Sequence, residues 1–284
     1  MLKALHIFII FAFSIFLSYC LTPMFIDVFS RGKSLAKNYR GELIPCGIGI
    51  VFILYSIVWY TLYLLLFNFH LLSALSMFDV LIVMIAFFAA SLIGFIDDVL
   101  GSRDTLGIKG HFKALFTGRL TTGAVKAIVG LLVSFVVSVF LSAGIAELLV
   151  NTLTIALFTN LLNLLDLRPG RAIKFYIFLL AIFAVNAALT GGYAVFWLFI
   201  PLIGSVLGYF PFDLKAKCMM GDAGSNVLGI SAGILAVMQL GRYEKFMALI
   251  LLVAVHIFAE KYSLSEVIKR NRVLNFLDNL GRQI

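Results

Sequence analysis

Long apolar runs alternate with short polar segments along almost the whole chain. A helix that crosses the hydrocarbon core of a membrane needs about 20 mainly apolar residues. The runs are continuous and lack the period of two that strands of a membrane barrel show. The pattern therefore predicts an all-α fold, a polytopic membrane bundle of about nine transmembrane helices. The expected spans are 4–26, 46–68, 76–96, 126–143, 147–165, 172–190, 192–210, 224–240 and 246–260. An alternative interpretation joins 172–190 and 192–210 in one hairpin with a turn at Gly191-Gly192.

Composition supports this interpretation, because 62% of the 284 residues are hydrophobic and only 13% are charged. The positive charges are distributed unevenly between the two sides of the predicted bundle. All but three of the 22 Lys and Arg residues fall in segments that alternate on one side. Positively charged segments stay in the cytoplasm, so we expect the N-terminus outside and the C-terminus in the cytoplasm. The segments on the basic side are 27–45, 97–126, 166–174, 211–223 and the chain from 261 onward.

The charge of the basic side also limits the partners. A net charge of +8, held mainly on one face, suits anionic lipid headgroups or an anionic substrate. A nucleic acid partner is not expected, because the basic residues lie in short segments between spans. We expect one membrane domain over residues 1–260, with its active site on the cytoplasmic face. Residues 261–284 form a partly amphipathic cytoplasmic tail that can lie on the membrane surface.

Acidic side chains on the same face carry the first candidate chemistry. Asp97 and Asp98 are adjacent at the end of an apolar run, in "SLIGFIDDVLG". Two neighbouring carboxylates can share a divalent cation, or one can bind metal while the other works as a base. The simpler interpretation is a hydrophilic stop after a span.

A second polar group lies in "FTNLLNLLDLRPGR", residues 158–171. Asn160, Asn163 and Asp166 are spaced three apart, which predicts a row along one helix face. Amides within an apolar span are costly unless they pair or line a cavity. Together with Arg168 and Arg171, the row is suited to reading a nucleobase and holding phosphates. Hydrogen bonding between helices is the alternative.

A third group is "MMGDAGSNVLG", residues 219–229, in which Asp222 lies among small residues at the start of a span. Small residues let a backbone approach a ligand, and a helix N-terminus offers free amides to a phosphate. Asp222 can hold Mg²⁺ there, or act only as a helix cap. Taken together, the three acidic groups and their basic surroundings predict a metal and a phosphorylated substrate on one membrane face.

The order of these motifs resembles the polyprenyl-phosphate N-acetylhexosamine-1-phosphate transferases. The resemblance covers most of the chain, from Ile44 to about residue 230. Members of this family move a sugar-1-phosphate from a UDP-sugar to a membrane polyprenyl phosphate and release UMP, with Mg²⁺ as cofactor. The motifs that carry it are Gly94-x-x-Asp97-Asp98, Asn163-x-x-Asp166 and Met220-Gly221-Asp222-x-Gly224-Ser225.

The resemblance implies a role for several residues. Asp222 resembles the magnesium ligand, and the pair Asp97 and Asp98 resembles the catalytic acids that bind metal or lipid phosphate and deprotonate the acceptor. Asn163 and Asp166 resemble the start of the nucleotide-binding loop. Lys126 resembles a basic residue of the family that meets phosphate, and we expect Arg168 and Arg171 to hold phosphates as well.

The chain departs from the family after Asp166. The family loop continues Asp-Gly-x-Asp-Gly, whereas this chain has Leu167, Arg168, Pro169 and Gly170. The His-rich loop of the pentapeptide transferases is absent too, so UDP-GlcNAc or a related amino sugar is the expected donor.

Two other interpretations stay open: a non-catalytic relative that binds polyprenyl phosphate or scaffolds an envelope complex, and a transporter. The transporter is less favoured because its expected mark, charges in mid-span, is largely missing. We expect a prokaryotic plasma-membrane protein, and homodimer formation is left open.

Overall fold

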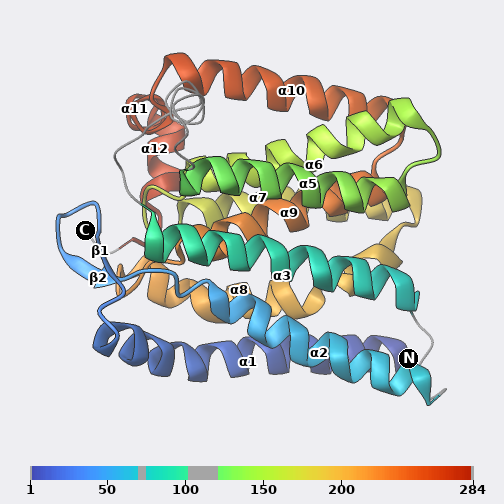
Figure 1. Cartoon of the computed structure of the whole chain (residues 1–284), viewed down its shortest axis with the longest axis horizontal. Helices are drawn as coiled ribbons and strands as arrows, with labels where there is room; N and C mark the ends of the chain where they lie inside the picture. The colour runs from blue at the N-terminus through green and yellow to red at the C-terminus, as the bar shows by residue number, and fades with distance from the viewer. Residues whose placement is uncertain (1, 70–74, 102–120, 283–284) are drawn as a thin grey trace.

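The computed structural model describes residues 2–69, 75–101 and 121–282. Its long helices run side by side and alternate in direction, so that the described chain forms one helical bundle (Figure 1). The helices of the bundle are α1 (Leu2–Arg31), α2 (Ile50–Asn68), α3 (Met77–Leu100), α5 (Thr122–Leu141), α6 (Ile145–Leu165), α7 (Arg171–Thr190), α8 (Ile200–Leu214), α9 (Gly221–Gln239) and α10 (Arg242–Lys261).

Short helices and strands lie at the two ends of this bundle. Strands β1 (Leu35–Lys37) and β2 (Leu43–Pro45) form an antiparallel hairpin between α1 and α2. A 3₁₀ segment, η1 (Tyr193–Leu198), precedes α8 at the other end. Helices α11 (Leu264–Arg270) and α12 (Arg272–Asn279) follow α10 and close the described chain.

The predicted all-α polytopic membrane fold is confirmed. Seven of the described helices are long and apolar enough to cross a membrane, and α10 with α11 forms a further pair bent by 93°. The expected continuous span 192–210 is wrong. Its first part is the 3₁₀ segment, and α8 has only 15 residues. Gly191, in a left-handed conformation, ends α7, and Pro201 fits only the first turn of a helix.

Helix α9 lies at the centre of the bundle, between α3 and α6 (Figure 1). In its most apolar stretch, 83% of the residues are buried inside the protein. Small residues make this possible, because a Cβ added at Gly229 would overlap the backbone of Thr159 in α6. A Cβ at Gly233 would lie 2.7 Å from Cα of Ile155 in the same helix. The close contacts fix α9 against α6, as small residues do in membrane helix pairs.

The segments predicted to be cytoplasmic gather at one end of the bundle, on the left in Figure 1. The β-hairpin, the C-terminal ends of α3, α6 and α8, the first turns of α5, α7 and α9, and both C-terminal helices lie there. Four of the basic residues counted on this side, Arg103, Lys109, Lys113 and Arg119, lie outside the described residues. The orientation of this end toward the cytoplasm stays a prediction.

Candidate active site

The start of α9 is held by the segment that leads into α2. Met219 N–H donates to Pro45 O at 2.8 Å, and Ile48 N–H donates to Met219 O at 3.2 Å. Gly49 N–H donates to Met220 O at 2.9 Å. This short parallel pairing places the first turn of α9, with its unpaired amides, beside the C-terminal end of α3.

Asp98 caps those amides. Its Oδ1 accepts a hydrogen bond from Asp222 N–H at 2.9 Å, and its Oδ2 accepts one from Ala223 N–H at 3.0 Å. A carboxylate at a helix N-terminus is stabilised by both the hydrogen bonds and the helix dipole. The approach needs two glycines: a Cβ at Gly94 would overlap the backbone of Asp222, and one at Gly221 would overlap the Asp98 carboxylate. The glycines of two sequence motifs thus bring α3 and α9 together.

Asp222 joins three other helices at this point. Its Oδ1 accepts from Asn163 Nδ2 at 2.8 Å, and its Oδ2 forms an ion pair with Lys126 Nζ. Asn163 also donates to Ser225 Oγ at 3.1 Å, and Lys126 Nζ lies 3.2 Å from Asp97 Oδ2. We call Asp97, Asp98, Lys126, Asn163 and Asp222 the carboxylate site.

The carboxylate site remains accessible. The side chains of Asp97, Lys126 and Asp222 are 19%, 24% and 25% exposed. Four helices contribute to it, because Asp97 and Asp98 come from α3, Lys126 from α5, Asn163 from α6 and Asp222 from α9. The structure therefore brings together five of the residues that the sequence selected as site residues.

The donor set of the carboxylate site fits a magnesium ion. Asp97 and Asp222 jointly hold one cation, the ammonium of Lys126. Among the described residues, no group of three or more His, Cys, Asp or Glu side chains is arranged to hold a metal. Mg²⁺ is commonly held by one or two carboxylates, with water and substrate phosphates completing the shell. Asp97 and Asp222 together supply the one or two carboxylates that such a site needs.

Asp166 lies at the end of α6, where its N–H donates to Asn163 O at 3.1 Å. Burial raises the pKa of the Asp166 carboxyl well above its usual range, and the negative charges of Asp213, Asp222 and Asp98 add to the shift. Asp166 thus lies within the electrostatic reach of the carboxylate site. Asp166 begins the turn 166–170. We call this segment the nucleotide turn, because the family resemblance predicts that it binds the nucleotide.

The predicted row of Asn160, Asn163 and Asp166 is only partly correct. Asn163 bonds to Asp222, whereas Asn160 is exposed on another side of α6. Successive steps of three residues fall short of a full helical turn by about 60° each, so the row drifts around the helix. Asn160 and Asp166 therefore do not share a face.

Arg168, within the nucleotide turn, and Arg171, directly after it, have different surroundings. The guanidinium of Arg168 stacks on the ring of Tyr39 in the β-hairpin loop, with Cζ 4.9 Å from the ring centroid. Arg171, at the start of α7, is buried and forms a two-pronged ion pair with Asp278 of α12, at 2.8 and 2.9 Å. Arg171 contacts the C-terminal helices, and its assignment to phosphate stays a prediction.

Sequence reasoning missed three residues around the nucleotide turn: Tyr39, Asp213 and Asp278. Asp213 is buried in α8, and its Oδ2 accepts from Gly170 N–H at 2.6 Å. Its position on the basic side of the chain was clear, but no motif connects it to Gly170. An acidic residue at the end of an apolar helix was the only signal that could have selected it.

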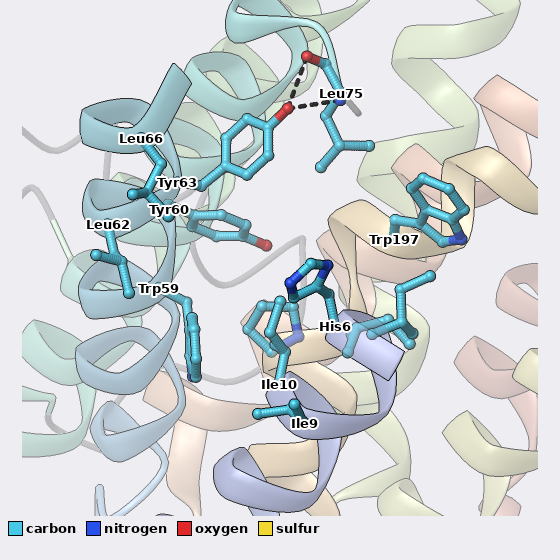
Figure 2. A pocket seen from close by; sticks show the side chains of 13 residues that line it. His6, Ile9, Ile10, Trp59, Tyr60, Leu62, Tyr63, Leu66, Leu75 and Trp197 are labelled. Atoms are coloured by element: carbon cyan, nitrogen blue, oxygen red, sulfur yellow. Dashed lines mark hydrogen bonds between the residues drawn. The ribbon is translucent and has the colours of Figure 1, made fainter. Parts of the chain in front are cut away.

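A cavity of about 220 Å³ opens at the opposite end of the bundle, between the start of α1, the end of α2 and the start of α8 (Figure 2). Its lining is apolar and aromatic, including Trp59 and Trp197. The hydroxyl of Tyr63 forms two hydrogen bonds with the backbone of Leu75. It accepts one from Leu75 N–H at 2.6 Å and donates one to Leu75 O at 2.9 Å. Because the carboxylate site lies at the other end, this cavity contributes no group to it.

Comparison with known proteins gives a consistent result. The sequence profile described as glycosyl transferase family 4 matches residues 80–240. A phospho-N-acetylmuramoyl-pentapeptide-transferase of Clostridium beijerinckii is 32% identical over 167 residues, 56% of this chain and 51% of that protein. The protein of the same name from Streptococcus thermophilus is 29% identical over 232 residues, 72% of this chain and 63% of its own length. The chain spans about half the length of the curated relatives it matches first.

Proposed function

Because this chain belongs to glycosyl transferase family 4, we propose that it transfers an N-acetylhexosamine-1-phosphate from a UDP-sugar to a membrane polyprenyl phosphate and releases UMP. The observation that carries the proposal is the carboxylate site. Asp97 and Asp222, from helices distant in sequence, hold one cation between them at the end of a membrane bundle. That arrangement suits a lipid phosphate arriving from the bilayer and a nucleotide arriving from water.

In the proposed reaction, an oxygen of the lipid phosphate forms a bond to the phosphorus that carries the sugar. The bond from that phosphorus to the UMP oxygen breaks, and UMP leaves with the electron pair. Asp97 accepts the proton of the lipid phosphate, because its carboxylate is partly exposed and beside Asp222. Mg²⁺, held by Asp222, would neutralise charge on the diphosphate.

Asp98 has a different task in this proposal. Both of its oxygens accept hydrogen bonds from the first turn of α9, so it positions Asp222. Asn163 orients the Asp222 carboxylate from the side of α6. Lys126 exchanges its contact with Asp222 for a contact with phosphate when the substrate is bound.

The donor binds along the nucleotide turn. Asp166 and Asn163 lie on the side that would meet the nucleoside, and Arg168 supplies a positive charge for phosphate. Arg168 takes part in none of the ion pairs of the described residues, and its guanidinium stacks on the ring of Tyr39. It is therefore the arginine of the turn that is free to bind an anion.

Two sugar donors are compatible with this site. UDP-GlcNAc is favoured by the unusual turn Leu167-Arg168-Pro169-Gly170 and the absent His-rich loop. UDP-MurNAc-pentapeptide is favoured by the printed name of the relatives. Both carry an N-acetylhexosamine-1-phosphate, so the reaction class is the same.

The test is UMP release by the purified protein with Mg²⁺, undecaprenyl phosphate and each of the two donors. We expect release with one donor, and a loss of about a thousandfold or more in Asp222→Asn. Asp27→Asn is a matched control, because Asp27 forms an exposed ion pair with Arg31 at the same end of the bundle. Release that survives Asp222→Asn would remove the carboxylate site from the reaction.

A non-catalytic relative is the second candidate, favoured by Pro169, which replaces the second Asp of the family loop. This candidate predicts that folded wild-type protein binds undecaprenyl phosphate but releases no UMP from either donor.

A further inference from the structure

The polar face of α12 docks on the start of α7. Arg171 Nε and Nη2 donate to the two carboxylate oxygens of Asp278, and Nη1 donates to Ser265 Oγ of α11 at 2.8 Å. Each of the two paired side chains is only 8% exposed. A two-pronged contact of this kind fixes orientation as well as distance. The first residue of α7 is thereby connected to both C-terminal helices.

Arg282 extends the contact to the nucleotide turn itself. Its Nε and Nη2 donate to Pro169 O at 3.2 and 3.0 Å, and Nη2 also contacts Asp278 Oδ1 at 3.0 Å. Lys174 completes the dock, because its Nζ donates to the carbonyls of Leu277, Asp278 and Leu280. A lysine at the last carbonyls of a helix satisfies acceptors that the helix leaves unpaired.

The nucleotide turn is held on its remaining sides by the body of the protein. Gly170 N–H donates to Asp213, and Gly170 has φ +74°, which favours glycine. Arg168 rests on Tyr39. The turn therefore has three attachments, to α8, to the β-hairpin loop and to the C-terminal helices.

Asp278 is the centre of the third attachment. Burial opposes its charge, but hydrogen bonds from Arg171 and Arg282 outweigh burial and lower the pKa of Asp278 to about 2. The Asp278 carboxylate therefore stays ionised throughout the neutral pH range. Its contacts with Arg171 and Arg282 do not depend on pH in that range. Removing one partner of such a buried network leaves the others unsatisfied.

Polar contacts, and not apolar burial, hold α12 in place. No residue of α12 is fully buried, and Val273, Phe276 and Leu277 are exposed. A helix of eight residues is too short to be stable alone, so its order comes from what it contacts. The contacts that order it are those of Asp278 with Arg171, Lys174 and Arg282.

We propose that α11 and α12, with Arg282, clamp the nucleotide turn in the conformation that binds the donor, and that Asp278 is the positioning residue of the clamp. This inference rests on the proposed function, since it assigns the donor to turn 166–170. Asp278 acts through Arg171 and Arg282 and touches no substrate. Its loss should affect the donor and spare the lipid acceptor.

The test compares Asp278→Asn, Asp278→Glu and Arg282→Gln with the wild type in full-length protein. Asp278→Asn removes the charge, Asp278→Glu keeps it, and Arg282→Gln removes the contact with Pro169 but leaves the Arg171–Asp278 pair. Asp27→Asn is the matched control, because it also removes an Asp–Arg ion pair, one whose two residues both lie in α1. The probes are UDP-GlcNAc, UDP-MurNAc-pentapeptide and undecaprenyl phosphate.

We expect Asp278→Asn and Arg282→Gln to raise the KM for the active UDP-sugar about tenfold or more, with little change in the KM for undecaprenyl phosphate. Asp278→Glu should restore part of the loss. Hydrogen–deuterium exchange over residues 166–171 should become faster in Asp278→Asn and Arg282→Gln and stay unchanged in Asp27→Asn. Equal rises in both KM values, or unchanged exchange over this segment, would overturn the clamp.

The exchange measurement needs no turnover, so it separates the clamp from the proposed function. If wild-type protein releases no UMP from either donor, the proposed function fails. Faster exchange in both variants would then still establish the clamp on the turn, and unchanged exchange would reject it.

Discussion

Asp97 and Asp98 are neighbours in the sequence, yet the structure gives their carboxylates different partners. Asp98 accepts two backbone hydrogen bonds from α9, whereas Asp97 faces the Lys126 ammonium. An Asn at position 98 keeps one acceptor but turns an amide NH₂ toward the second backbone N–H. That loss costs about 1–3 kcal/mol.

The two substitutions should therefore separate stability from activity. We expect Asp98→Asn to lower the thermal unfolding temperature of the detergent-solubilised protein clearly, and Asp97→Asn to leave it near the wild-type value. Both variants should lose UMP release, Asp97→Asn without loss of fold. If Asp97→Asn is the less stable of the two, the division of roles is wrong.

The sequence selected several of the residues that the structure brings together in the carboxylate site. Acids and amides in otherwise apolar spans are costly, so they draw attention, and Asp97, Asn163 and Asp222 do meet. The partners of Arg171 were not predictable in the same way. Its contact with Asp278 joins positions 107 residues apart, and nothing local in either segment specifies the other.

At the scale of elements, the approach of α3 to α9 decides the geometry of the site. Gly94 is the contact point, because an added Cβ would overlap the Asp222 and Ala223 backbone. Gly130 in α5 is a matched comparison, since a Cβ there meets nothing within 4 Å. The same replacement of Gly by Ala is therefore sterically blocked at position 94 in α3 and unobstructed at position 130 in α5.

We expect Gly94→Ala to destabilise the protein by about 1–3 kcal/mol or more, because α3 and α9 must separate to admit the methyl group. Gly130→Ala should be neutral or stabilise by up to about 1 kcal/mol. Thermal unfolding and UMP release measure both effects. Equal behaviour of the two variants would mean that the α3–α9 contact tolerates displacement.

The elements also show the limits of counting apolar residues. The run 192–210 is apolar enough to predict one span, but it contains a 3₁₀ segment and then the start of the short helix α8, with Pro201 in the first turn of that helix. Hydropathy indicates whether a segment lies in lipid or in water, but it does not predict the backbone conformation of that segment. Glycine and proline carry that second kind of information, because they restrict or free the backbone dihedral angles at a helix end.

At the scale of the whole molecule, orientation in the membrane is the property that connects the site to its substrates. The positive-inside rule predicts that the carboxylate site faces the cytoplasm. Gly144 directly precedes α6 and Lys215 directly follows α8, so the two residues lie at opposite ends of the bundle, and both are exposed. They are therefore suitable reporters of the two sides.

We expect a membrane-impermeant maleimide to label Gly144→Cys in intact cells and Lys215→Cys only after permeabilisation. The background protein carries Ala at Cys20, Cys46 and Cys218, so that each reporter is the single thiol. UMP release by that background protein checks its fold. The reverse labelling pattern would place the carboxylate site outside the cell.

The ion pairs of Lys126 with Asp97 and Asp222 affect how the protein folds after insertion into the membrane. Because the Lys126 ammonium lies between Asp97 and Asp222, the folded chain supplies its own counter-charge to the two carboxylates. We therefore expect the bundle to close before any divalent ion binds, and the Mg²⁺ that we propose would enter as a late and reversible partner. A chelator should then stop the proposed UMP release without lowering the thermal unfolding temperature, and added Mg²⁺ should restore UMP release without a refolding step.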